Sequence, residues 1–322
     1  METRPLSFLV ASDSFELVIL TRDRPELLKK TVYSALKQTC PIPFKIIISD
    51  NSVCEETQII VNELWPQIEY RRFHDLPAAV HFSSAIKLCA STYLMLFHDD
   101  DIFLDNCIWS MINAIQANPG FSAVACNARL ISDQSLTRLT MFRAKRNDRL
   151  LSICSQRHLI ARYIDSAKGS ICPFPSYIYR SSCIDSSLLD YASSVAGKHW
   201  DLVFLLSVLN RAPFLWISRP LVAYRIHNGQ DSFTHNVKDW MSLMRHLYSV
   251  YDLPRRSLVT LNYKANFYRK ALRLRPFDIF SRGVSRRTVL ARMSFLLICK
   301  RLLLDPRYLC SVISVYLNRL FL

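Results

Sequence analysis

Short apolar runs alternate with helical patterns over the first part of the chain. Branched apolar residues dominate the segments 15–20 and 44–49, and a third apolar run covers residues 93–97. Such runs are typical of strands that are buried on both faces of a sheet. The intervening segments 26–39 and 55–64 carry apolar residues at helical spacing. This alternation predicts an α/β fold with a doubly wound, mostly parallel sheet.

Further elements extend this pattern along the chain. We expect strands at 68–73, 121–127, 214–218 and 221–226, and helices at 80–89, 104–117 and 198–209. The expected organisation is an N-terminal tail (1–14), one large domain (15–240) and a basic, mainly helical C-terminal region (241–322).

Three consecutive aspartates, Asp99, Asp100 and Asp101, come shortly after the apolar run 93–97. Adjacent carboxylates repel one another and are costly to desolvate, and a hard divalent cation relieves both effects. Open α/β sheets bind their ligands at the carboxyl ends of strands. Asp50 ends a second apolar run in the same way, so we expect a site where these strand ends meet. The alternative is an Asp-rich turn that caps a helix.

Composition narrows the ways in which this chain can hold a ligand. There are only five glycines, and no Gly-rich phosphate loop of the dinucleotide or P-loop type occurs. A bound nucleotide would need another way to hold its phosphates, and a metal ion is the obvious candidate. The ten cysteines include no CxxC pair, which favours buried thiols in a reducing compartment. Because the first 14 residues lack the apolar core of a signal peptide, we expect a cytoplasmic protein.

Most of the net charge of +15 lies near the C-terminus. Residues 241–322 contain sixteen Lys or Arg against three Asp, a balance of +13. Charges interrupt the apolar patches here, so we expect this region to lie on the anionic inner face of the cytoplasmic membrane without crossing it. A nucleic-acid-binding protein that uses the same block, with Tyr263, Phe267 and Tyr268 stacking on bases, is the competing hypothesis. It leaves the acidic residues unexplained, so no nucleic acid is expected.

Four segments of the chain occur in a characteristic order: VILTRDRPELLKKTVYSALKQT (18–39), IIISDNS (46–52), YLMLFHDDD (93–101) and YRIHNG (224–229). Together they resemble the inverting family 2 glycosyltransferases of the GT-A fold, over roughly residues 15 to 235. The resemblance implies transfer of a sugar from a nucleotide-sugar, with a UDP-sugar as first choice. The acceptor implied is a lipid-linked or oligosaccharide acceptor in surface polysaccharide synthesis.

The resemblance also implies binding residues: Thr21, Arg24, Asp50 and Asp99 for the donor nucleotide, and Asp100 and His227 for a Mg²⁺ or Mn²⁺ ion. Asp50 would accept a hydrogen bond from the base, and Asp100 would contact the metal directly. Arg24 would reach the diphosphate, although exposed loop arginines are usually only solvated. A structural histidine is the alternative for His227.

An inverting transfer needs a general base that takes the proton of the acceptor hydroxyl. The resemblance points to Asp201, with His199 as second choice and a helix cap as the alternative. The family often has a Glu-Asp pair near this position, where this chain has Lys198 and His199, so an inactive relative that binds nucleotide-sugars is a third hypothesis. His98 likewise replaces the first Asp of the DXD motif. Residues 132–170 are polar and poorly patterned, and we expect them to pass over the site.

Overall fold

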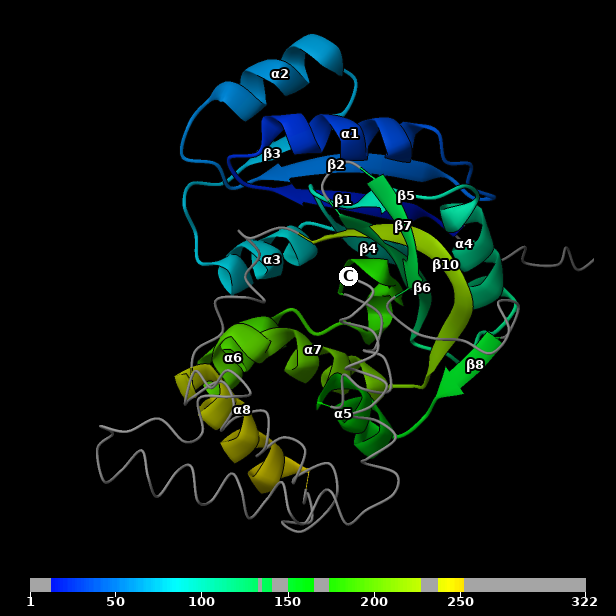
Figure 1. The fold of residues 1–322 in the computed structure, drawn as a ribbon, viewed down its shortest axis with the longest axis vertical. Coiled ribbons are helices and arrows are strands. Elements are labelled where there is room, and N and C mark those ends of the chain that lie inside the picture. The colour runs from blue at the N-terminus through cyan, green and yellow to red at the C-terminus, as the bar shows by residue number, and fades with distance from the viewer. Residues whose placement is uncertain (1–12, 133–134, 141–149, 165–173, 227–236, 252–322) are drawn as a thin grey trace, which may run out of the picture.

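The computed structural model describes residues 13–132, 135–140, 150–164, 174–226 and 237–251 (Figure 1). Its first part alternates strands and helices, as the sequence predicts. The elements are β1 (Phe15–Thr21), α1 (Pro25–Leu36), β2 (Phe44–Asp50), α2 (Glu56–Leu64), β3 (Glu69–Arg72), α3 (Ala78–Lys87), β4 (Tyr93–His98), β5 (Ile102–Phe103), α4 (Cys107–Gln116) and β6 (Ala123–Ser132).

The second part adds shorter strands and a group of helices. Its elements are β7 (Ser135–Thr140), β8 (Leu150–Ile153), α5 (Gln156–Ile164), β9 (Tyr177–Arg180), α6 (Ser187–Ala196), α7 (Trp200–Leu209), β10 (Phe214–Ile226) and α8 (Val237–Val250). Short 3₁₀ turns occur at Phe174–Ser176, Ser181–Cys183 and Gly197–His199. The sequence does not predict β5, β7, β8, β9, α5 or α6.

The strands of the described residues form one sheet in the order β3-β2-β1-β4-β9-β6-β10-β5, with β7 paired to β6 and β8 to β10. Strands β3, β2, β1 and β4 are parallel to one another, and β6 is parallel to β10. Strand β9 lies between β4 and β6 and is antiparallel to both. The predicted α/β fold with a mostly parallel sheet is confirmed, with the antiparallel strand β9 beside its centre and β5, β7 and β8 paired antiparallel to β10 or β6.

Both faces of the sheet are buried, which explains the continuous apolar runs. Leu17 and Ile19 of β1 pack on the side of α1 and α4, whereas Val18 and Leu20 pack on the side of α3 and α7. All four side chains are at most 5% exposed. Figure 1 shows α1 on one side of the sheet and α6 and α7 on the other. Helices on both faces are the arrangement that a doubly wound sheet requires.

One bent strand replaces the two that the sequence predicts at 214–218 and 221–226. The pairing of β10 with β6 is irregular between Ile217 and Val222. Pro220 lies in this interval and has no backbone N–H to donate, so the ladder is interrupted there while the chain stays extended.

The C-terminal part of the described chain is α8, which packs against α6 and the Gly197–His199 turn. The expected domain boundary at residue 240 falls within this helix, and the division into 15–240 and 241–322 stays a prediction. Residues 252–322, most of the basic region, and residues 1–12 of the N-terminal tail lie outside the described residues. Among the helices that are described, none combines the length and apolar character needed to cross a membrane.

Candidate functional site

The carboxyl ends of three neighbouring strands meet at one edge of the sheet. In the strand register, Thr21 at the end of β1 lies opposite Asp50 at the end of β2. On the other side of β1, Leu20 lies opposite His98, the last residue of β4. The acidic turn that follows His98 therefore sits next to Thr21. Residues from widely separated parts of the sequence are brought together here, at the edge where such sheets bind ligands.

Asp99 is held by the loop that follows β1. The Thr21 hydroxyl donates to Asp99 Oδ2 at 2.8 Å, and the Arg22 backbone N–H donates to the same oxygen at 3.3 Å. Arg24 Nη1 lies 3.4 Å from Asp99 Oδ1 and 3.0 Å from Asp100 Oδ2. Burial raises the pKa of Asp99 to about 7, and the nearby Asp100 charge adds to the rise while Arg24 opposes it. Arg24 is thus a counterion of the acidic turn.

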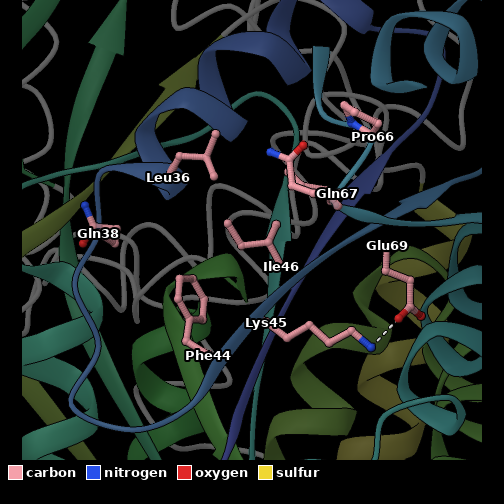
Figure 2. Close-up of a pocket in the computed structure, with 9 residues that line it drawn as sticks. Leu36, Gln38, Phe44, Lys45, Ile46, Pro66, Gln67 and Glu69 are labelled. Atoms are coloured by element: carbon pink, nitrogen blue, oxygen red, sulfur yellow. Dashed lines mark ion pairs between the residues drawn. The ribbon is translucent and has the colours of Figure 1, made fainter. Parts of the chain in front are cut away.

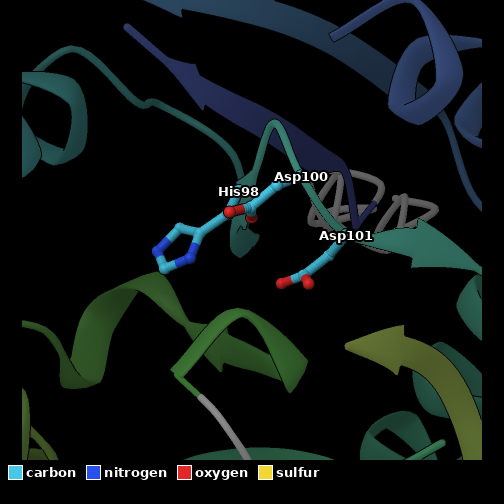
Figure 3. A group of neighbouring side chains, drawn as sticks. All are labelled: His98, Asp100 and Asp101. Atoms are coloured by element: carbon cyan, nitrogen blue, oxygen red, sulfur yellow. The ribbon is translucent and has the colours of Figure 1, made fainter. Parts of the chain in front are cut away.

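His98, Asp100 and Asp101 form a group that fits a metal ion (Figure 3). One potential ligand atom from each lies within 4.8 Å of the others. Asp101 is fully buried; its Oδ1 accepts the Arg225 backbone N–H at 2.9 Å, and its Oδ2 has no hydrogen-bond partner among the described residues. Burial and the Asp100 charge raise the pKa of Asp101. A buried carboxylate oxygen without a donor, beside a second carboxylate and an imidazole, suits Mg²⁺ or Mn²⁺.

Two residues that the sequence reasoning did not single out hold the backbone of this turn. The hydroxyl of Thr31, buried on α1, lies 2.7 Å from the carbonyl oxygens of both Asp99 and Asp101. Arg225 Nε donates to the carbonyl oxygen of Asp100 at 2.9 Å. Thr31 lies on the apolar face of α1, together with Leu28, Val32 and Ala35. A polar residue at such a position is the sequence feature that could have marked Thr31 as important.

Asp50 is fully buried and already oriented by hydrogen bonds. Its Oδ1 accepts the Ser52 backbone N–H at 2.8 Å, and its Oδ2 accepts the Tyr70 hydroxyl at 2.5 Å. The Asn51 side chain makes two 2.9 Å hydrogen bonds with the backbone of Leu76 and so holds the segment after β3 across the end of β2. The Asp50 carboxylate is therefore a fixed acceptor at the rim of the site.

Asp201 lies in the first turn of α7. The ring of its neighbour Trp200 is 4.8 Å from that of Phe82, which is 5.8 Å from that of His98. Burial raises the pKa of Asp201 to about 6. His199, the second choice for the base, is 1% exposed, and His227 lies outside the described residues.

Part of the segment 132–170 also reaches this region. The described residues include β7, β8 and α5, and Tyr163 of α5 donates a 2.9 Å hydrogen bond to Asp201 Oδ1. The other residues, 133–134, 141–149 and 165–170, lie outside the described part of the chain. The expectation that residues 132–170 pass over the site therefore stays a prediction.

A separate hollow of about 680 Å³ lies at the opposite end of the strands (Figure 2). Its lining includes Phe44 and Lys45, the first residues of β2, and an ion pair joins Lys45 to Glu69. Asp50 ends β2 six residues after Phe44, which corresponds to roughly 20 Å along an extended strand. This hollow is therefore not part of the site at the carboxyl ends.

Comparisons with known proteins agree with this geometry. Residues 16–170 match the sequence model of glycosyl transferase family 2. A search of curated proteins found no match. The crystal structure of S. aureus TarS is similar with a TM-score of 0.52 and 13% identity, covering 92% of this chain and 50% of the TarS chain.

A shorter S. aureus structure, TarS 1–349 in complex with UDP-GlcNAc, is similar with a TM-score of 0.51 and 14% identity, covering 81% of this chain and 82% of that one. At these identities the likeness concerns the fold. Residues 16–170, just under half of the chain, are thus similar in sequence to glycosyl transferase family 2, and the fold is of the GT-A type.

Proposed function

We propose that this protein transfers a sugar, with inversion, from a nucleotide-sugar to a lipid-linked or oligosaccharide acceptor in surface polysaccharide synthesis. The observation that carries the proposal is the meeting of Thr21, Asp50 and the acidic turn at the carboxyl ends of adjacent strands. The family match supports the reaction class. The complex of S. aureus TarS with UDP-GlcNAc supports a UDP-sugar as the first donor to test.

The rim of the site has the chemistry to recognise a nucleotide. An ionised carboxylate only accepts hydrogen bonds, so Asp50 suits a base edge that presents an N–H, as uracil does. Thr21 and Asp99 lie beside it, where a ribose would follow the base. Arg24 carries a positive charge next to the acidic turn and is suited to the diphosphate.

His98, Asp100 and Asp101 would hold the Mg²⁺ or Mn²⁺ ion, and His227 stays a predicted ligand. When bound, such an ion offsets the negative charge that develops on the departing diphosphate. Thr31 hydrogen-bonds to the backbone of the acidic turn and keeps its carboxylates in place.

Asp201 is the proposed general base. As the acceptor oxygen bonds to the anomeric carbon, the opposite bond to the diphosphate oxygen breaks and its electron pair leaves with the nucleotide. Asp201 takes the hydroxyl proton. A pKa near 6 supports this role, since the carboxylate is ionised at neutral pH yet more basic than an exposed one. The deep burial of His199 favours Asp201 over it.

Calorimetric titration of UDP, with and without Mn²⁺, tests the proposal. We expect metal-dependent binding that is lost in Asp100→Ala and kept in Asp105→Ala, which removes an exposed carboxylate nearby. A screen of UDP-sugars for transfer follows. If UDP, GDP and dTDP all fail to bind with either Mg²⁺ or Mn²⁺, the glycosyltransferase proposal falls.

The basic region would attach the enzyme to the inner face of the cytoplasmic membrane, where lipid-linked acceptors lie. Its balance of +13 supports this proposal. Flotation of the full chain should be strong with vesicles that contain an anionic lipid and weak with neutral vesicles, and should decrease with added salt. Equal flotation with both vesicle types would contradict it.

A further inference from the structure

Three polar side chains meet at the start of α7. They come from different elements: Tyr163 from α5, His199 from the Gly197–His199 turn, and Asp201 from α7. The Tyr163 hydroxyl lies 2.9 Å from Asp201 Oδ1 and 3.0 Å from His199 Nδ1. The Leu202 backbone N–H also donates to Asp201 Oδ1, at 2.8 Å.

The chemistry of these groups fixes the direction of the hydrogen bonds. Ionised Asp201 can only accept, so the single hydroxyl proton of Tyr163 points to its Oδ1. The Tyr163 oxygen must then accept from His199, which places a proton on His199 Nδ1. The hydrogen bonds from Tyr163 and Leu202 therefore both support Oδ1 of Asp201.

We propose that His199 and Tyr163 are positioning residues that hold the general base through a directed chain, from His199 Nδ1–H to the Tyr163 hydroxyl to Asp201 Oδ1. This inference rests on the proposed function, because it concerns the same base. It also gives a role to His199, which stands where the family often has an acidic residue. The acidic pair is replaced by a carboxylate that receives its support from a tyrosine and a histidine.

This chain of hydrogen bonds also affects the pKa of Asp201. Among the described residues, the further titratable group that faces Asp201 is Tyr179 of β9, while Tyr224 of β10 faces Tyr163. Burial raises the pKa of Asp201, and the hydrogen bond from Tyr163 lowers it. Loss of the Tyr163 hydroxyl leaves the ionised carboxylate less stabilised, so the pKa of Asp201 should rise.

Carbon-13 NMR titration of the aspartate carboxyls tests this without knowledge of the donor. The signal of Asp201 is identified by its absence in Asp201→Asn. We expect its pKa to rise by about one to two units in Tyr163→Phe, the effect of one hydrogen bond to a charged group. The matched control is Tyr179→Phe, because the Tyr179 hydroxyl is near Asp201 but has no hydrogen-bond partner among the described residues. The same pKa in both variants and the wild type would overturn the proposal.

The histidine is tested by paired substitutions. In His199→Asn the amide can replace the Nδ1–H donor, so the pKa of Asp201 should stay near the wild-type value, whereas in His199→Leu it should rise. A wild-type pKa of Asp201 in His199→Leu would show that His199 does not take part in the hydrogen-bonded chain. Near-ultraviolet circular dichroism checks that each variant is folded.

Sugar transfer then separates this inference from the proposed function. If Asp201→Asn keeps the transfer rate, Asp201 is not the base, whatever the NMR result. If Asp201→Asn is inactive but Tyr163→Phe leaves the pKa of Asp201 unchanged, Asp201 is supported as the general base and the positioning role of Tyr163 and His199 is refuted.

Discussion

The substitution Asp99→Asn should stabilise the ligand-free protein at pH 8 and have much less effect in acid. Asp99 is 4% exposed and lies beside Asp100, and its pKa is raised from 3.8 to about 7. Asparagine has nearly the same shape, and its carbonyl oxygen can still accept from the Thr21 hydroxyl and the Arg22 backbone N–H. The main change is therefore the removal of a buried negative charge.

The size of the effect follows from the two pKa values. The unfolded chain ionises Asp99 near pH 3.8, but the folded chain keeps its proton until about pH 7. Between these values the wild-type free energy of unfolding falls by about 1.4 kcal/mol per pH unit as the pH rises. The advantage of the variant should therefore grow from about 1.5 kcal/mol at pH 5 to about 4 kcal/mol at pH 8. The favourable contact with Arg24 is already contained in this pKa, so it needs no separate subtraction.

Urea unfolding followed by circular dichroism, at pH 5 and pH 8 with EDTA present, measures this difference. Asp105→Asn removes an exposed carboxylate and should show no such pH dependence. Addition of Mn²⁺ at pH 8 should stabilise the wild type more than Asp99→Asn, because the variant has lost a charge that attracts the ion. A difference that does not grow with pH would refute the argument that burial and the Asp100 charge dominate at Asp99.

Other predictions concern the second layer of the site and the base. Thr31→Val should lower the free energy of unfolding by about 1–3 kcal/mol and weaken Mn²⁺-dependent UDP binding, since it removes the single hydroxyl proton that the carbonyl oxygens of Asp99 and Asp101 share. Thr31→Ser keeps the hydroxyl, so urea unfolding and calorimetry should both give values near the wild type. Tyr70→Phe should weaken UDP binding about tenfold with unchanged circular dichroism, because Asp50 loses a donor. For wild-type transfer, kcat/KM should rise with pH through about 6 as Asp201 ionises, and Asp201→Asn should lower kcat by about 10²–10⁴-fold.

Local sequence patterns predict the part of the site that lies at strand ends. The run 93–97 is buried on both faces, and its continuous apolar character marks the strand and the position of the aspartates after it. The same holds for Asp50 after the run 44–49. Alternating helices imply parallel strands, and parallel strands place their carboxyl ends on one edge. The neighbouring positions of Asp50 and Asp99 therefore follow from the pattern.

Local sequence patterns do not reveal contacts between elements that are distant in the sequence. Tyr163 reaches Asp201 across 38 residues, from a segment whose polar composition indicates only a surface excursion. Arg225 reaches Asp100 because β10 pairs with β5, and a two-residue strand has too short a pattern to be predicted. Strand β9 is only four residues long and enters the sheet antiparallel, against the alternation around it. These features depend on tertiary packing, which overrides local propensity.

The arrangement of the acidic turn argues against helix capping as its role. The turn is followed by β5, and the next helix, α4, begins at Cys107 with Asn106 as its cap. The backbone N–H groups that Asp99 and Asp101 accept belong to the loop after β1 and to β10, and neither lies in α4. Thr31 and Arg225 bind the carbonyl oxygens of the turn and fix its backbone, whereas no described residue donates a hydrogen bond to Asp101 Oδ2. Within the described residues, a firmly held backbone beside an unsatisfied buried carboxylate is the arrangement that the proposed cation site requires.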